Sequence, residues 1–367
     1  MTLSQRRDRL RDRLLAAGLD AMLVTDLVNV RYLSGFTGSN AALLIRVSDT
    51  TPVLATDGRY RTQAAAQAPD AEVVIERACG PQLAARAAAA GVDRLGFESH
   101  VVTVDDHRRL LDAAGPTELV RAPGTVEALR EVKDAGEVAL LRLACEAADA
   151  ALTELLARGG LRPGRTEKEV RRDVESLMLD HGADGPSFET IVAAGANSAI
   201  PHHRPTDAVL ADGDFVKIDF GALVSGYHSD MTRTFVLGRA ADWQQEIYAL
   251  VEDAQRAGRE ALAAGVTLKD VDAASRQVIA DAGYAEYFGH GLGHGVGLQI
   301  HEAPGINAAA AGTLLAGSAV TVEPGVYLPD RGGVRIEDTL VVGAQTGTGS
   351  DTPDLLTRFP KELVVLD

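Results

Sequence analysis

Two aspartates frame a predicted β-hairpin between residues 214 and 235. Asp219 and Asp230 lie on either side of the turn signal Ser225–Gly226. A turn centred on this pair makes the aspartates diagonal neighbours, and a turn centred one residue earlier places them directly opposite. Both registers put the carboxylates on one face, about 4.5–8 Å apart. Like charges so close favour a divalent cation between them, the alternative being two solvent-facing aspartates at a hairpin mouth.

A second group of candidate residues consists of histidines in a glycine-rich segment. His290, His294 and His301 lie within twelve residues, although the chain has nine histidines in all. Glycine lets backbone and imidazoles crowd close to a ligand. The segment lacks the strand–loop–helix context of a dinucleotide-binding fingerprint, and no Glu follows His290 as a zincin helix requires. The clustering favours a functional site, while each histidine alone could be an ordinary hydrogen-bonded one.

Two glutamates complete the set of candidate ligands. Glu323 and Glu337 each lie in a strand-like, β-branched run, where a half-buried carboxylate must be paired, protonated or metal-bound. Arg335 shares the face of Glu337, so a plain salt bridge is the alternative there. Four carboxylates and one imidazole suit Mn²⁺ or a similar hard divalent ion better than a structural zinc. Such a set can bridge two ions about 3.5–4 Å apart and activate a water, with nearby histidines moving protons.

The elements that must position these residues fall into two regions. In the first third, strand-like runs (21–25, 41–46, 52–55, 72–75 and 94–97) alternate with alanine-rich helical stretches, which predicts an α/β domain over residues 1–124. Pro123–Gly124 is a turn signal and the expected boundary. Residues 126–158 then indicate a long helical region with Glu137 toward water. Consecutive antiparallel strand pairs and further helices favour an α+β domain over residues 125–367.

Composition excludes several classes of protein. The chain has 367 residues, 46% hydrophobic and 24% charged, as in a globular protein of two domains. Its net charge of −16 argues against a nucleic-acid partner, which needs a basic face. Cys79 and Cys145 are too few for a disulfide framework. Asp20 interrupts the N-terminal apolar run, and the uncharged stretch 303–322 indicates loop plus strand, so we expect no signal peptide, no membrane partner and a cytoplasmic location.

The order of the candidate ligands resembles the metal-ligand set of the pita-bread metallopeptidases, in particular their proline-specific branch of Xaa-Pro aminopeptidases and prolidases. The resemblance covers nearly the whole chain. It includes residues 32–40 (YLSGFTGSN), typical of a creatinase-like N-terminal domain, residues 129–133 with Glu137 at the start of the catalytic domain, and residues 357–363 (TRFPKEL) near the end. It implies a pita-bread α+β catalytic domain with pseudo-twofold halves, preceded by the α/β domain.

The resemblance also implies a role for each candidate residue. The expected metal ligands are Asp219, Asp230, His294, Glu323 and Glu337, with Asp230 and Glu337 bridging two ions. The expected metal is Mn²⁺, with Zn²⁺ or Co²⁺ as alternatives. The expected catalytic residues besides Glu323, which would accept a proton from water, are His202 on the substrate side and His301 as hydrogen-bond donor or proton shuttle. His290 and Arg335 would contact substrate.

These roles imply hydrolysis of the N-terminal Xaa-Pro bond of short peptides with proline at the second position. The short first domain and the motif GFTGSN favour an Xaa-Pro aminopeptidase, and an Xaa-Pro dipeptidase (prolidase) is the alternative. Methionine aminopeptidase is a less favoured alternative, because the first domain would have no purpose in such an enzyme. A non-catalytic pita-bread binding protein would have lost ligands, and all five positions are filled. A homodimer is expected.

Overall fold

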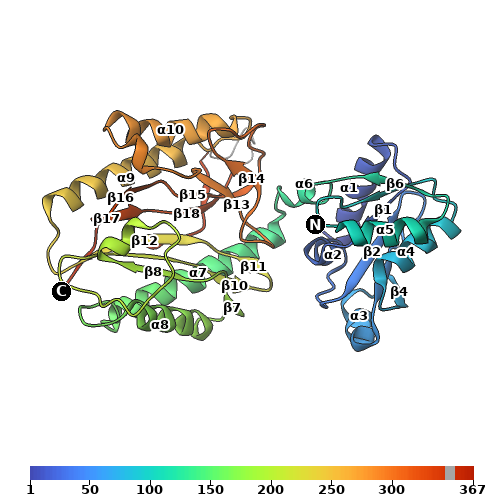
Figure 1. The fold of residues 1–367 in the computed structure, drawn as a ribbon, viewed down its shortest axis with the longest axis horizontal. Coiled ribbons are helices and arrows are strands. Elements are labelled where there is room, and N and C mark those ends of the chain that lie inside the picture. Colours follow the sequence, from blue (N-terminus) through green and yellow to red (C-terminus); the bar gives the residue numbers. More distant parts are fainter. Residues whose placement is uncertain (344–351) are drawn as a thin grey trace. The chain divides into compact units, whose positions relative to one another are not determined.

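The computed structural model describes residues 1–343 and 352–367, which form two compact units, residues 1–130 and 131–367 (Figure 1). The predicted boundary follows Gly124, and the short helix α6 (Glu127–Arg130) belongs to the first unit. Across the described ranges, none of the helices combines the length and apolar character needed to cross a membrane.

The first unit is a mixed sheet with helices. Its strands lie in the order β4-β3-β2-β1-β5-β6, with β1–β5, β5–β6 and β3–β4 parallel. The strand bounds are β1 (Ala21–Val24), β2 (Ala41–Arg46), β3 (Val53–Thr56), β4 (Glu72–Ile75), β5 (Arg94–Phe97) and β6 (Glu118–Arg121). The helices are α1 (Leu3–Ala16), α2 (Leu27–Ser34), α3 (Arg61–Gln67), α4 (Cys79–Ala89) and α5 (Val104–Ala114), with the 3₁₀ turn η1 (Gly58–Tyr60). The α/β prediction is confirmed.

The second unit begins with two helices against an antiparallel sheet. Helices α7 (Ala135–Ala157) and α8 (Glu167–Asp180) pack on each other, and their apolar faces share one core with the sheet β20-β12-β9-β8. The strands are β8 (Ile191–Ala194), β9 (Phe215–Phe220), β12 (Met231–Leu237) and β20 (Val365–Leu366). A smaller sheet contains β7 (Gly185–Pro186), β10 (Ala222–Val224) and β11 (Tyr227–His228), and η2 spans Gly195–Ala199.

A second half of similar construction follows. Helices α9 (Asp242–Glu260) and α10 (Leu268–Asp281) pack together and share a separate core with the sheet β14-β13-β15-β18-β19 and the hairpin β16–β17. The bounds are η3 (Ala285–Tyr287), β13 (Gly293–Gly295), β14 (Glu302–Ile306), β15 (Ala319–Val322), β16 (Gly325–Leu328), β17 (Gly332–Arg335), β18 (Asp338–Val341) and β19 (Asp354–Leu355). Figure 1 shows the two helix pairs on opposite sides of the sheets, so the strands meet between them.

The hairpin register follows one of the two predicted alternatives. The turn is centred on Ser225–Gly226, whose φ angles of 49° and 78° are those of a tight primed turn. Asp219 of β9 therefore pairs with Thr232, and Asp230 becomes its diagonal neighbour. The two carboxylates stay on one face of the hairpin, as both registers required.

The predicted helical region over residues 126–158 is two helices, α6 and α7. A short non-helical segment separates them. Helix α7 begins after Asp134 because the side chain of Asp134 accepts hydrogen bonds from the backbone N–H groups of Gly136 and Glu137, which forms a capping box. The expectation that Glu137 faces water is wrong: it is 3% exposed, and it accepts a hydrogen bond from the hydroxyl of Tyr227. A capping glutamate buried in this way fixes α7 against the smaller sheet.

Candidate metal centre

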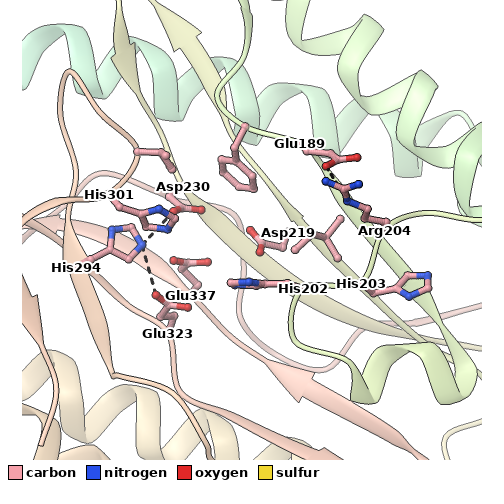
Figure 2. Close-up of a pocket in the computed structure, with 13 residues that line it drawn as sticks. Glu189, His202, His203, Arg204, Asp219, Asp230, His294, His301, Glu323 and Glu337 are labelled. Carbon is pink, nitrogen blue, oxygen red and sulfur yellow. Dashed lines mark ion pairs between the residues drawn. The ribbon is translucent and has the colours of Figure 1, made fainter. Parts of the chain in front are cut away.

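The five predicted metal ligands come from both halves of the second unit and face one cavity. Asp219 lies on β9 and Asp230 directly precedes β12, whereas His294 lies on β13. Glu323 follows β15, and Glu337 lies between β17 and β18. All five line a cavity of about 300 Å³, together with His202 and His301 (Figure 2). The site therefore exists only where the two halves meet.

The carboxylates of this cluster are buried beside one another. Asp230 and Glu337 are 4% and 2% exposed. Burial, and then the mutual repulsion of neighbouring carboxylates, raises the pKa of Asp230 and of Glu337 well above the usual range. Burial likewise raises the pKa of Glu323 to about 8. In the absence of a cation the cluster therefore retains protons, because several buried negative charges cannot coexist in so small a volume.

His294 is oriented as a metal ligand. Its Nδ1 lies 3.0 Å from the carbonyl oxygen of Gly295, to which it donates in the tautomer that leaves the Nε2 lone pair free. Nε2 lies 3.5 Å from both Asp230 Oδ2 and Glu323 Oε1. Ligand atoms of Asp230, His294 and Glu337 all lie within 4.8 Å of one another. Burial lowers the pKa of His294 to about 4, so the imidazole is neutral near pH 7.

Asp219 supplies the clearest test of whether these residues fit a metal. Its Oδ2 accepts a hydrogen bond from Nη2 of Arg335 over 2.5 Å, but its Oδ1 is buried with no hydrogen-bond partner. A buried carboxylate oxygen without a partner is costly unless something positive meets it. The donor set is four carboxylates and one neutral imidazole, which matches the preference of hard divalent cations. The residues fit such ions.

The remaining predicted site residues line the same cavity or an adjoining one. His202 and His301 are exposed and line both cavities, and the ring of His301 lies 4.4 Å from that of His294, centroid to centroid. His290 and Arg335 line the adjoining cavity of about 610 Å³. Burial lowers the pKa of His290 to about 4. The structure thus brings every predicted site residue into one region.

Two buried residues of this region are absent from the sequence prediction. The hydroxyl of Tyr327 lies 2.9 Å from Nε2 of His290 and accepts from Nη1 of Arg335 over 2.8 Å, so it joins the two predicted substrate contacts. Lys217 donates to the carbonyl oxygens of Ser198 and Ile200 over 3.1 and 2.8 Å, in the segment leading to His202. The sequence signal that could have identified Lys217 is a lysine between apolar neighbours in a strand-like run.

Two glycines of the histidine-containing segment are required because the backbone of neighbouring strands leaves no room for a side chain. A Cβ atom on Gly293 would lie 2.0 Å from the carbonyl oxygen of Thr321, and one on Gly295 would lie 2.1 Å from that of Ala303. Only glycine permits β13 to approach β15 and β14 this closely. This approach places His294 over the carboxylate cluster, in agreement with the predicted crowding.

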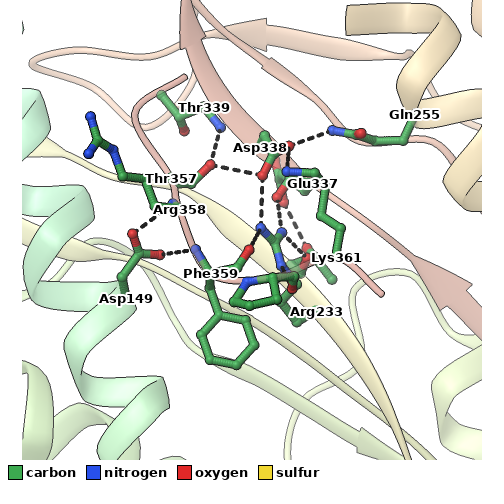
Figure 3. Close-up of polar contacts among 12 residues, drawn as sticks. Asp149, Arg233, Gln255, Glu337, Asp338, Thr339, Thr357, Arg358, Phe359 and Lys361 are labelled. Carbon is green, nitrogen blue, oxygen red and sulfur yellow. Dashed lines mark hydrogen bonds and ion pairs between the residues drawn. The ribbon is translucent and has the colours of Figure 1, made fainter. Parts of the chain in front are cut away.

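The backbone at Glu337 and at the start of β18 is held by a buried polar network (Figure 3). Arg233 donates to the carbonyl oxygen of Glu337 over 2.5 Å and to Asp338 Oδ1 over 2.8 Å. Lys361 lies 3.0 Å from Asp338 Oδ2, and Arg233 also donates to the carbonyl oxygen of Phe359. The network ties the C-terminal segment to the backbone beside Glu337 and so restrains that carboxylate.

Comparison with known proteins gives two family matches and several close relatives. Metallopeptidase family M24 matches residues 139–344, and the Creatinase/Prolidase N-terminal domain matches residues 6–132. An Xaa-Pro dipeptidase of Pyrococcus horikoshii is 39% identical over 274 residues, which are 75% of this chain and 76% of that protein. The chain also resembles the solved structure of an Xaa-Pro dipeptidase from Bacillus anthracis, with a TM-score of 0.93, 39% identity and complete coverage of both chains.

A further solved structure, an X-Pro aminopeptidase from Thermotoga maritima, is 34% identical, with a TM-score of 0.88 and coverage of 98% of this chain and 99% of that one. These matches extend over both units, and they agree with a cluster of carboxylates and histidine suited to divalent ions. The chain belongs to metallopeptidase family M24, as a proline-specific pita-bread metallopeptidase whose catalytic domain follows a creatinase-like N-terminal domain.

Proposed function

We propose that this protein is an Xaa-Pro dipeptidase that uses two divalent ions, with Mn²⁺ the expected metal. The observation that carries hydrolysis is the convergence of five ligand side chains, Asp219, Asp230, His294, Glu323 and Glu337, on one cavity. Ions held by these residues would supply a water-activating and carbonyl-polarising Lewis acid. Proline specificity is supported by the relatives named above.

The chain's own residues perform the remaining steps. Glu323 accepts the proton of the attacking water, and His301, beside the ligand His294, hydrogen-bonds the developing oxyanion or moves the proton to the leaving nitrogen. His202 contacts the substrate from the loop between η2 and β9. His290 contacts the substrate from the adjoining cavity, where Arg335 orients Asp219. The cavity that contains the five predicted ligands is called the main cavity below. Its apolar side chains, Phe188, Ile191 and Ile300, offer a surface for the proline ring.

The relatives favour the dipeptidase over the aminopeptidase that the sequence analysis preferred. The Pyrococcus and Bacillus proteins are dipeptidases by name. The aminopeptidase remains the second candidate because the Thermotoga structure resembles the chain over almost its full length.

One assay separates the candidates. The Mn²⁺-loaded protein is given Ala-Pro, Ala-Pro-Ala and Met-Ala-Ser, and release of the first residue is followed. Cleavage of Ala-Pro without cleavage of Ala-Pro-Ala supports the dipeptidase, and the reverse supports the aminopeptidase. Cleavage of Met-Ala-Ser alone would contradict proline specificity. A homodimer and a cytoplasmic location stay predictions, and the elution volume in size-exclusion chromatography tests the former.

A further inference from the structure

The main cavity has two chemically different ends. The ligand cluster occupies one end, and an ion pair between Glu189 and Arg204 lies at the other, with His202 between them (Figure 2). Arg204 is the one arginine or lysine among the described residues that line this cavity. A peptide whose scissile bond lies at the ligand cluster therefore has a single permanent positive charge within the same cavity.

The ion pair leaves Arg204 able to bind an anion. Its Nε lies 3.2 Å from Oε2 of Glu189, and the side chains of Arg204 and Glu189 are 83% and 52% exposed. The pair engages Nε, so the outer edge of the guanidinium, with Nη1 and Nη2, faces solvent in the described structure. A guanidinium edge is the geometry that binds a carboxylate through two parallel hydrogen bonds. Glu189 restricts the orientation of the guanidinium from the other side.

The neighbouring His203 fixes the loop that carries this arginine. Its Nε2 lies 2.8 Å from Oε2 of the buried Glu167, which also accepts from the backbone N–H of Thr206. The backbone on both sides of Arg204 is therefore anchored in the protein interior. The guanidinium is presented from a fixed backbone, although its own side chain is exposed.

An Xaa-Pro dipeptide carries its free carboxylate on the residue that follows the scissile bond, whereas a longer peptide has a neutral amide there. Consecutive residues are about 3.8 Å apart, so this carboxylate lies one residue from the reacting carbon. We propose that Arg204, oriented by Glu189, binds the C-terminal carboxylate of the substrate and makes the enzyme selective for dipeptides. This inference rests on the proposed dipeptidase function and adds the residue that sets the length of the substrate.

The test compares two substrates that differ only in this charge. The Mn²⁺-loaded wild-type protein and the variant Arg204→Gln are assayed with Ala-Pro and with Ala-Pro amide, in which a carboxamide replaces the carboxylate. We expect the variant to lose about 10-fold in kcat/KM for Ala-Pro, chiefly through KM, as for a lost hydrogen bond to a charged group. The value for the amide should change less than about twofold, because that substrate has no charge to lose.

Three controls make the result specific. Arg204→Lys keeps the charge without the fork and should recover part of the loss. Arg256→Gln removes another exposed, ion-paired arginine, on α9, and should leave the kcat/KM of both substrates unchanged. The melting temperature of Arg204→Gln should match that of the wild type, because exposed ion pairs contribute little to stability.

The outcomes distinguish this inference from the proposed function. If the wild type cleaves Ala-Pro and Arg204→Gln cleaves it equally well, or loses Ala-Pro and its amide to the same extent, the role of Arg204 is overturned while the dipeptidase stands. If the wild type does not cleave Ala-Pro, the proposed function fails, and the inference fails with it.

Discussion

Nη2 of Arg335 lies 2.5 Å from Oδ2 of Asp219, and the two residues are 2% and 7% exposed. The same guanidinium donates through Nε to Thr232, whose hydroxyl donates to Glu337. Arg335 thus fixes one oxygen of the predicted ligand Asp219, whose other oxygen, Oδ1, stays buried without a partner. It reaches a second predicted ligand, Glu337, through Thr232.

This relationship predicts the effect of Arg335→Lys. The variant keeps the positive charge but cannot contact Asp219, Thr232 and Tyr327 at once. Loss of an orienting contact of this kind costs about 10- to 100-fold in metal affinity or activity. Mn²⁺ titration by calorimetry and steady-state turnover measure the two effects. Wild-type values of both would show that the contact does not orient the ligand.

Removal of a predicted bridging ligand should abolish both metal binding and activity. Asp230→Ala and Glu337→Ala each take one carboxylate from the buried cluster. We expect two Mn²⁺ per chain in the wild type, metal loss in each variant, and turnover at background. Elemental analysis after gel filtration measures the metal content, and Glu146→Gln, an exposed carboxylate of α7, is the matched control. Normal turnover in either alanine variant would contradict the two-metal centre.

His301→Ala separates proton transfer from metal binding. The side chain packs beside His294 and is not one of the five predicted ligands. Turnover should fall about 10²- to 10⁴-fold, the usual loss of acid–base assistance, while the Mn²⁺ content stays at the wild-type value. Unchanged turnover would assign His301 to packing. His100→Gln, a histidine of the first unit, is the control.

Lys217→Met should destabilise the protein without removing a predicted ligand. The ammonium group lies in a fully buried strand and donates to the carbonyl oxygens of Ser198 and Ile200. Leaving these buried acceptors unsatisfied costs about 1–3 kcal/mol in the free energy of unfolding. Denaturant unfolding measures this loss. Because the segment leads to His202, an accompanying rise in KM is expected. Unchanged stability would show that the carbonyls find other partners.

The metal-free protein should become less stable as the pH rises. Burial raises the pKa of Glu323 from its usual 4.5 to about 8 in the folded state, so folding favours the protonated carboxyl. The resulting stabilisation is complete below the unfolded pKa and is lost as the pH passes through the folded pKa. Thermal unfolding with a chelator between about pH 5 and 9 tests this. Stability of the metal-free protein that increases over this window would contradict it.

Local sequence patterns predicted five of the six strands of the first unit. The five strand-like runs of the first domain match β1 to β5, because alternation with helices and turn signals is a short-range property of the chain. The helical region predicted over 126–158 is divided into α6 and α7, since the capping contact of Asp134 starts a new helix. The register of the Asp219 hairpin was left open and was decided by the backbone conformation of its turn.

The sequence by itself determined which residues could bind metal, because carboxylates and imidazoles stand out in β-branched and glycine-rich runs, and their order resembles a known family. Only the tertiary structure decided that two separately built halves bring these residues to one cavity. It also revealed the partners of Arg335 and Lys217 and the position of Arg204. These contacts join residues up to 134 positions apart in the sequence, such as Arg335 and the carbonyl oxygen of Pro201, and no local pattern encodes such a pairing.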